Sequence, residues 1–139
     1  MELDDQLCFA LYSASKAMTA RYRPALEQMG VTYPQFLVLM ALWEDDDQTV
    51  GALCARVGLD SGTMSPLLKR LAAIELVTRH RPVEDERQVR IQLTDAGRAL
   101  EQPACGVSAM MIGVLGLQSA EIDQLKSRLE TITARLSRS

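Results

Sequence analysis

The feature that most constrains this chain is the order of its patterns between residues 49 and 93. A short helical pattern over TVGALCARVGLD precedes a second over DSGTMSPLLKRLAAIELV, and Gly58 lies between them as the stop expected after a last helical turn. The next stretch, LVTRHRPVEDERQVRIQLT, alternates apolar and polar residues around a charged centre, which predicts two strands joined by an exposed loop. Two helices followed by such a hairpin are the layout of a winged helix-turn-helix, which reads DNA with its second helix.

The second of these helices has distinct inner and outer faces, and Asp60 or Ser61 can cap its first turn. The inward apolar stripe is predicted to be Leu67, Leu68, Leu71 and Ile74. Outward hydroxyl and basic side chains suit bases and phosphates, so the predicted DNA contacts are Ser61, Thr63, Ser65, Lys69 and Arg70. The predicted DNA contacts also include Asp85 and Arg87 in the hairpin loop, and we expect Asp85 to orient Arg87 by an ion pair.

Helical spacing also dominates the flanking sequence. A first helix is expected over residues 3–29, capped by Asp4 or Asp5, broken or bent at Pro24 and ended by Gly30. A second begins at Thr32 with Pro34 in its first turn, and EDDD ends it as a solvated turn. The apolar residues expected to be buried on this second helix are Phe36, Leu37, Leu39, Met40 and Trp43. With 4% aromatic residues and few strand-like runs, the chain should be mainly α with a small β-hairpin wing.

The end of the chain predicts further helices that need a partner. One opens at Thr94 and Asp95, and the other opens at Ser119. The last helix has a near-heptad stripe of Ile122, Leu125, Leu129, Ile132 and Leu136. We therefore expect a single domain over 1–139, in which 31–94 form the DNA-binding lobe and 1–30 and 95–139 form dimerisation helices. A twofold dimer would read an inverted-repeat operator.

Charge is distributed unevenly along the chain. The net charge is −3, but residues 56–98 carry eight Lys or Arg against six acids, which favours DNA contact by the middle of the chain alone. The N-terminal MELDDQL is acidic, unlike a secretion signal, and no apolar run reaches the length of a membrane span. We therefore expect a cytoplasmic protein without a membrane partner. The three cysteines form no metal-type spacing, and we expect no metal and no cofactor.

Several segments together resemble the MarR family of bacterial repressors. They are Asp85 and Arg87 with VRIQLTDAGRAL at 89–100, and LLKRLAAIELVTR at 67–79. Three further blocks resemble the organic-hydroperoxide-sensing OhrR branch: LCFALYSASKAM at 7–18, TYPQFLVLMALWE at 32–44 and LDSGTMSPLLKRL at 59–71. This resemblance implies a homodimer on an inverted-repeat operator, an interface formed by the first and the two last helices, and Arg87 in a minor groove.

Cys8 is the candidate redox-sensing residue. It lies within about the first turn of its helix, where free N–H groups and the helix dipole favour the thiolate, although Asp4 and Asp5 oppose this. Tyr12 follows one turn later on the same face. By spacing alone such a cysteine is more often a small buried residue. The OhrR resemblance favours reactivity, and implies that Tyr22 and Tyr33 reach Cys8 from the other subunit; Tyr12 also matches.

Other residues allow two interpretations. Cys105 is a candidate resolving cysteine for oxidised Cys8, and a small cellular thiol is the other candidate. Cys54 falls among core positions, and the lone His80 is expected on the surface or at a phosphate. The apolar run of Met110, Met111, Ile112, Val114 and Leu115 suits a dimer core, and also a pocket for the tail of a hydroperoxide.

The resulting prediction is a DNA-binding repressor released when organic hydroperoxide oxidises Cys8, and not an enzyme. Two alternatives stay open. A MarR-type repressor could instead be released by a reversibly bound phenolic or drug-like ligand, and its induction would survive Cys8→Ser. A thiol peroxidase would use Cys8 with Tyr12 as donor, but the sequence holds no further acid–base constellation for it.

Overall fold

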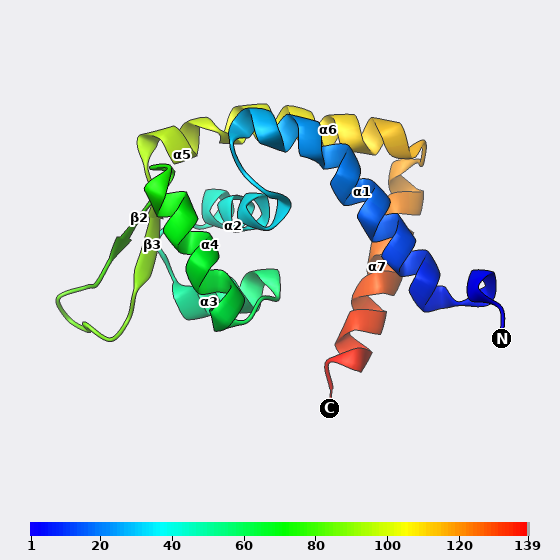
Figure 1. Cartoon of the computed structure of the whole chain (residues 1–139), viewed down its shortest axis with the longest axis horizontal. Helices are drawn as coiled ribbons and strands as arrows, with labels where there is room; N and C mark the ends of the chain where they lie inside the picture. The colour runs from blue at the N-terminus through cyan, green and yellow to red at the C-terminus, as the bar shows by residue number, and fades with distance from the viewer. Residues whose placement is uncertain (139) are drawn as a thin grey trace. The chain divides into compact units, whose positions relative to one another are not determined.

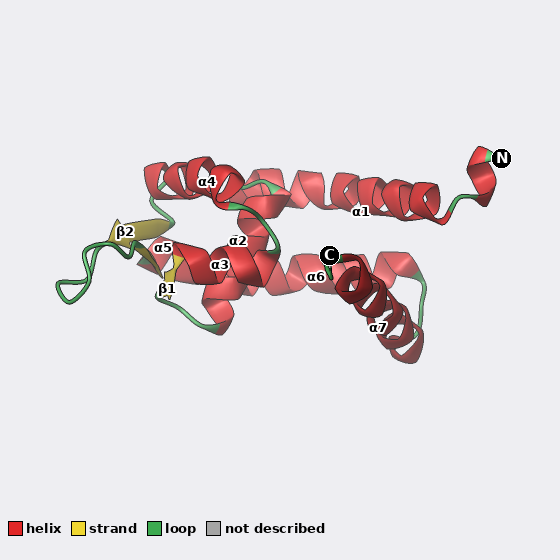
Figure 2. Ribbon diagram, turned by 90° about the horizontal axis from the view of Figure 1, so that it is seen from below, coloured by secondary structure: helices red, strands yellow, loops and turns green. Residues whose placement is uncertain are grey.

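Helices form most of the chain in the computed structural model, which describes residues 1–138 (Figures 1 and 2). The order of elements is η1 (Leu3–Asp5), α1 (Leu7–Met29), α2 (Tyr33–Glu44), β1 (Gln48–Thr49), α3 (Val50–Val57), α4 (Ser61–Ala73), β2 (Val77–His80), β3 (Arg90–Leu93), α5 (Asp95–Ala99), α6 (Glu101–Leu115) and α7 (Ser119–Leu136). The chain divides into two compact units, Met1–Val107 and Ser108 onward. The predicted mainly α architecture with a small hairpin is confirmed.

The hairpin belongs to a three-stranded antiparallel sheet of order β1-β3-β2. Strands β2 and β3 pair from Val77 opposite Leu93 to His80 opposite Arg90, while β1 pairs with the other edge of β3. Val77, Ile91 and Leu93 are buried, which fixes the register because a one-residue slip would expose them. Strand β1 was not foreseen, because two residues are too short to show an alternating pattern.

The helix ends follow local signals. Thr32 and Gln35 form a capping box on α2, and the side chains of Thr49, Asp60 and Thr94 cap α3, α4 and α5. The backbones of Gly30 and Gly58 adopt left-handed conformations that end α1 and α3, as expected. Because these signals act between near neighbours in the chain, they could be predicted without knowledge of the tertiary structure.

Three expectations about helices were wrong. Asp4 and Asp5 lie in η1, two residues and one residue before the N-cap position Gln6, and α1 begins at Leu7 without a side-chain cap. Pro24 does not end α1, because the Ala20 carbonyl that loses its donor belongs to an exposed residue, where water can replace the missing N–H. Ile74 is 46% exposed, since α4 ends at Ala73 and the inward stripe stops there.

The core of the first unit lies where α2, α3 and α4 meet β2 and β3. Its fully buried side chains are Phe36, Val38, Leu39, Leu42, Leu53, Met64, Leu68, Leu71, Val77 and Ile91. Phe36 and Leu39 are buried as predicted, whereas Leu37, Met40 and Trp43 are only half-buried. This core packs α4 against the strands of the hairpin.

The terminal helices leave apolar surface uncovered. In α1 only Leu26 is buried, and Leu7, Tyr12 and Met18 remain between 37% and 63% exposed. No residue of α7 is buried, and Leu125 and Leu136 of its near-heptad stripe are exposed. In α6, Met110, Ile112, Val114 and Leu115 are exposed whereas Met111 is buried. Apolar surface of this extent is typical of helices that pack against another chain.

Membrane-spanning potential is confined to one bent segment. Within residues 1–138 no single helix is both long and apolar enough to cross a bilayer, although Asp95–Leu115 and Ser119–Leu136 together satisfy the criteria of length and composition.

Candidate DNA interface and redox site

Helix α4 presents a polar face outward. Its buried residues are Met64, Leu67, Leu68 and Leu71, and the predicted contacts Ser61, Thr63, Ser65, Lys69 and Arg70 are all exposed. Asp60 fixes the first turn, because its Oδ1 accepts the Thr63 N–H at 2.7 Å. Hydrogen bonding to the Thr63 backbone lowers the pKa of Asp60, so the cap is a carboxylate at neutral pH. The hydroxyls in the first turns of α4 are therefore carried on a fixed backbone.

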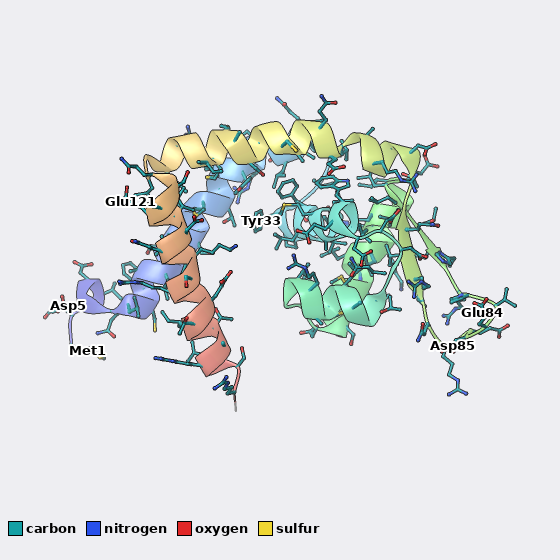
Figure 3. All side chains as sticks on the ribbon, turned by 180° about the vertical axis from the view of Figure 1, so that it is seen from behind. Met1, Asp5, Tyr33, Glu84, Asp85 and Glu121 are labelled. Carbon is teal, nitrogen blue, oxygen red and sulfur yellow. The ribbon has the colours of Figure 1, made fainter. Side chains whose placement is uncertain are left out.

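The wing loop between β2 and β3 has internal bonds that shape its tip. Asp85 Oδ1 accepts the backbone N–H of Arg87 at 3.1 Å, and Arg81 Nη1 donates to the Glu86 carbonyl at 2.8 Å. Figure 3 shows Glu84 and Asp85 at the free end of the hairpin. The expected ion pair between Asp85 and Arg87 is absent from the described residues, because Asp85 holds the Arg87 backbone instead. The Arg87 guanidinium is consequently exposed without a carboxylate partner in residues 1–138.

The wing root contains a polar cluster that sequence reasoning missed. Asp47 Oδ1 lies 3.1 Å from Arg90 Nε and 3.4 Å from His80 Nε2, and the Arg90 guanidinium also donates to the Asp47 carbonyl. Asp46 accepts the Leu93 N–H at 2.9 Å and lies 3.3 Å from Arg98. The EDDD segment is thus a bonded connection to the wing rather than a solvated turn. No local signal could reveal it, because Asp47 and Arg90 are 43 residues apart.

Cys8 is the second residue of α1, and its side chain is exposed. It lies in the helical turn whose N–H groups have no intrahelical acceptor, as predicted. Tyr12, one turn later, is 60% exposed, and Lys16 Nζ stands 5.1 Å from the centroid of its ring. No hydrogen bond joins Tyr12 to Cys8 within the described part of the chain. The thiol is therefore accessible to a reagent in solution.

Tyr22 and Tyr33 lie together in the first unit, with ring centroids 5.2 Å apart, and both pack against Phe36 with their rings tilted. Burial, and secondarily the neighbouring Tyr33, raise the pKa of Tyr22, so it stays a hydrogen-bond donor over a wide pH range. Tyr22 follows Cys8 by fourteen residues on one continuous helix, which is about 21 Å along its axis. The chain by itself therefore does not bring the tyrosine pair to Cys8.

The remaining cysteines are free thiols as well. Cys54 is half-buried against the core, as predicted, and Cys105 is exposed on α6. Among residues 1–138 no group of three or more metal-type ligands comes together. Cys8 and Cys105 are thus the two thiols that a reagent can reach most readily.

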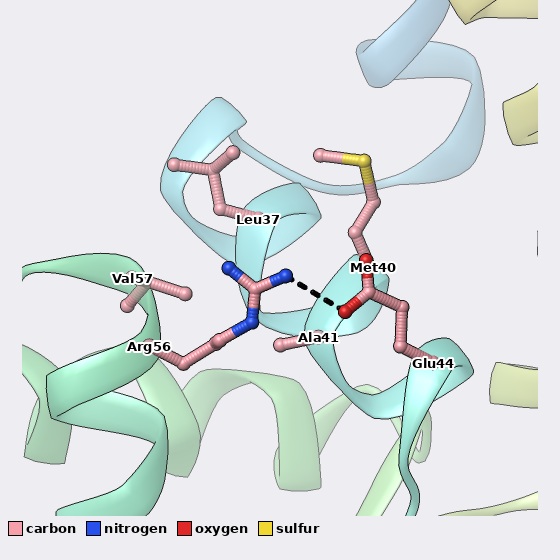
Figure 4. A pocket seen from close by; sticks show the side chains of 6 residues that line it. All are labelled: Leu37, Met40, Ala41, Glu44, Arg56 and Val57. Carbon is pink, nitrogen blue, oxygen red and sulfur yellow. Dashed lines mark hydrogen bonds and ion pairs between the residues drawn. The ribbon is translucent and has the colours of Figure 1, made fainter. Parts of the chain in front are cut away.

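A shallow hollow of about 250 Å³ lies between α2 and α3 (Figure 4). Its wall consists of Leu37, Met40, Ala41 and Val57, and Arg56 Nη2 meets Glu44 Oε2 across the rim at 2.8 Å. Both charged side chains are more than half exposed, so the pair contributes at most about 1 kcal/mol to stability. Because the guanidinium is already paired, we assign no ligand to this hollow.

Comparison with known proteins decides the family. A sequence family described as "Transcriptional regulator SarA/Rot" matches residues 20–102. The organic hydroperoxide resistance transcriptional regulator of Bacillus subtilis is 42% identical over 136 residues, which cover 98% of this chain and 92% of the relative. The chain belongs to the MarR family of transcriptional regulators. This match confirms the predicted resemblance to the MarR family and to its OhrR branch, which three blocks of the sequence resemble.

Solved structures of a MarR-type regulator in different redox states are also similar. Reduced AbfR bound to DNA matches with a TM-score of 0.83 at 36% identity, covering 96% of this chain and 92% of that one. Disulfide-formed AbfR matches with a TM-score of 0.68 at 35% identity, covering 96% and 89%. AbfR comes from Staphylococcus epidermidis. The MarR-type chain described here thus resembles the reduced, DNA-bound form more closely than the disulfide form.

Proposed function

We propose that this MarR-family protein is a homodimeric repressor that holds an inverted-repeat operator while Cys8 is reduced, and leaves it when an organic hydroperoxide oxidises Cys8. The observation that carries the proposal is the exposed Cys8 thiol in the first turn of α1, in a chain that also presents an ordered DNA-reading face. The relationship to the Bacillus subtilis regulator and to AbfR supports both halves of the proposal.

The DNA-binding half rests on α4 and the wing. The exposed hydroxyls of Ser61, Thr63 and Ser65 suit base edges and phosphates in a major groove, and Lys69 and Arg70 suit the flanking phosphates. The unpaired guanidinium of Arg87 at the wing tip suits the narrower minor groove. Reduced AbfR was solved on DNA, which supports the assignment of duplex DNA as the partner.

The redox half is a two-step thiol reaction. The Cys8 thiolate sulfur attacks one peroxide oxygen, the O–O bond breaks, and the alkoxide takes a proton and leaves as an alcohol, so that Cys8 becomes a sulfenic acid. A second thiol then displaces hydroxide, which leaves as water, and a disulfide forms. That thiol is either Cys105, which is exposed, or a small cellular thiol. Intact mass separates the two outcomes, because only the small thiol adds its own mass.

A dimer would bring Tyr22 and Tyr33 of one subunit to Cys8 of the other. Cys8, Ser15 and Tyr22 follow one another at intervals of seven residues, about two turns, so they share one stripe of α1. If two α1 helices cross antiparallel at the small Ser15, Cys8 of one subunit faces Tyr22 of the other, with Tyr33 beside it. Such a crossing would also cover the exposed apolar residues of α1. Oxidation of Cys8 would then disturb the interface that sets the spacing of the two readers.

Operator binding tests the proposal directly. The probe is a fluorescent duplex selected from a random pool by the reduced protein, and anisotropy is measured at fixed salt before and after one equivalent of cumene hydroperoxide. Wild type should release the duplex and rebind it after dithiothreitol, because disulfides and sulfenic acids are reduced by thiols. Cys8→Ser should stay bound throughout. Cys54→Ser is the matched control, since it removes a half-buried thiol and should respond like wild type.

Other outcomes point to the alternatives. Identical behaviour of wild type and Cys8→Ser would refute the redox switch and favour a repressor released by a reversibly bound ligand. Consumption of many peroxide molecules per subunit in the presence of reductant would indicate a thiol peroxidase instead.

A further inference from the structure

Asp47 has a backbone conformation that calls for an explanation. Its φ of 58° lies in the left-handed region, which side chains disfavour and glycine adopts freely. A glycine would therefore fit this turn with less strain. An aspartate tolerates the left-handed conformation better than most residues, but it still costs the turn some stability relative to glycine. A residue kept in a strained backbone conformation indicates a function for its side chain.

The Asp47 carboxylate joins both strands of the wing. Arg90 on β3 and His80 on β2 are cross-strand partners, and they form the last pair before the wing loop begins. Both side chains reach the same Oδ1 of Asp47, at 3.1 Å and 3.4 Å, and the Arg90 guanidinium also donates to the Asp47 carbonyl. A two-stranded hairpin is only marginally stable by itself, so these contacts, of which those of Arg90 are hydrogen bonds, restrain it where it leaves the sheet.

The restraint continues from this pair into the wing loop. Arg81 follows His80 directly and donates to the Glu86 carbonyl, and Asp85 then accepts the Arg87 N–H. Asp47, His80 and Arg90 also line one hollow together with Glu84 and Asp85 of the loop. The contacts of Asp47 at the root are thus followed, one residue beyond His80, by the bonds that shape the loop around Arg87.

We propose that Asp47 is a positioning residue for DNA binding, because its carboxylate sets the direction of the wing and hence the place of Arg87. This inference rests on the proposed function, in which Arg87 contacts the operator. Asp47 itself lies at the wing root and is not proposed to contact DNA. Its effect on affinity should therefore depend on Arg87.

A double-mutant cycle tests this dependence. Operator affinity is measured at fixed salt for the full-length reduced protein, for Asp47→Gly, for Arg87→Ala and for the double variant. Arg87→Ala should weaken binding by about 5- to 150-fold. Asp47→Gly should weaken it by about fivefold or more, but by no more than Arg87→Ala. In the Arg87→Ala background, Asp47→Gly should change affinity by less than about twofold, since no wing contact is left to position.

Two further variants separate positioning from folding. Asp47→Asn keeps the side-chain shape and also tolerates a left-handed backbone, so its loss of operator affinity reports the charge alone. Glu75→Gly is the matched backbone control, because Glu75 also has a positive φ, 62°, and its side chain makes no hydrogen bond or ion pair among residues 1–138. Glu75→Gly should bind the operator like wild type. Amide exchange should accelerate across residues 81–89 in Asp47→Gly and stay unchanged in α4.

The cycle distinguishes failure of this inference from failure of the proposed function. If Arg87→Ala weakens binding but Asp47→Gly does not, the positioning role is refuted while the wing contact stands. Equal effects of Asp47→Gly in both backgrounds would also refute it, since Asp47 would then act on the fold in general. If Arg87→Ala binds like wild type, the wing contact itself is wrong, and the positioning role falls with it.

Discussion

Replacement of Gly97 by alanine should destabilise the first unit by about 1 to 3 kcal/mol, although alanine normally stabilises a helix. Gly97 is buried in α5, and an added Cβ would lie well under 3.0 Å from the Leu76 carbonyl oxygen and 3.1 Å from Leu93 Cδ2. The neighbour is backbone and cannot rotate away. Helix α5 must therefore shift by about an ångström, at a cost of about 1 to 3 kcal/mol for overpacking.

Two smaller terms act in opposite directions. A shift of α5 strains the bond from Trp43 Nε1 to the Gly97 carbonyl, 2.9 Å, and the bond from the Thr94 N–H to the Leu76 carbonyl, 3.1 Å. Loss of one such bond costs about 1 kcal/mol. The higher helix propensity of alanine returns about 1 kcal/mol. These two contributions offset each other, so overpacking decides the sign of the change in the free energy of unfolding.

Urea unfolding followed by the fluorescence of Trp43 suits this test, because Trp43 is the only tryptophan and bonds directly to Gly97. Protein concentration must be constant, since a dimer gains stability by mass action. Gly51→Ala is the control, because Gly51 lies in α3 with nothing within 4 Å of the added Cβ. It should raise the midpoint or leave it unchanged. A midpoint of Gly97→Ala at or above that of wild type, with an unchanged slope, would refute the packing argument.

Three further predictions concern the DNA interface and two titrating groups. Arg87→Ala should weaken operator binding by about 1 to 3 kcal/mol in an anisotropy titration, and an unchanged dissociation constant at fixed salt would contradict this. Because burial raises the pKa of Tyr22, the folded state keeps this proton longer, so stability should fall as pH rises above 10.0. Unfolding midpoints from pH 9 to 11 should show a smaller fall in Tyr22→Phe than in wild type. The Thr63 N–H lowers the pKa of Asp60, so this cap's contribution is present above pH 3.8 and lost as pH falls below it; Asp60→Asn should show less acid sensitivity in the same assay.

Much of the fold could be predicted because its signals are local. Thr32, Asp60 and Thr94 cap helices by accepting N–H groups three residues onward, and Gly30 and Gly58 end helices by their own backbone conformations. The errors at Asp4, Asp5 and Pro24 concern helix ends and kinks, where several local solutions have similar free energies. The predicted DNA-contact and redox residues remain predictions; the family supports them all, and exposure supports Cys8 and the DNA contacts on α4 and the wing.

The sequence by itself determined the order of helices, the inner and outer faces of α4, the hairpin with Arg87 in its loop, and a cysteine at a helix start. All of these follow from spacings of two to seven residues, within which the backbone sets the geometry. Only the tertiary structure decided that Asp47 joins His80 and Arg90, and that Trp43 bonds to Gly97. These three contacts join residues 33 to 54 positions apart. Their free energy arises only once the core has brought distant segments together, so no local pattern records it.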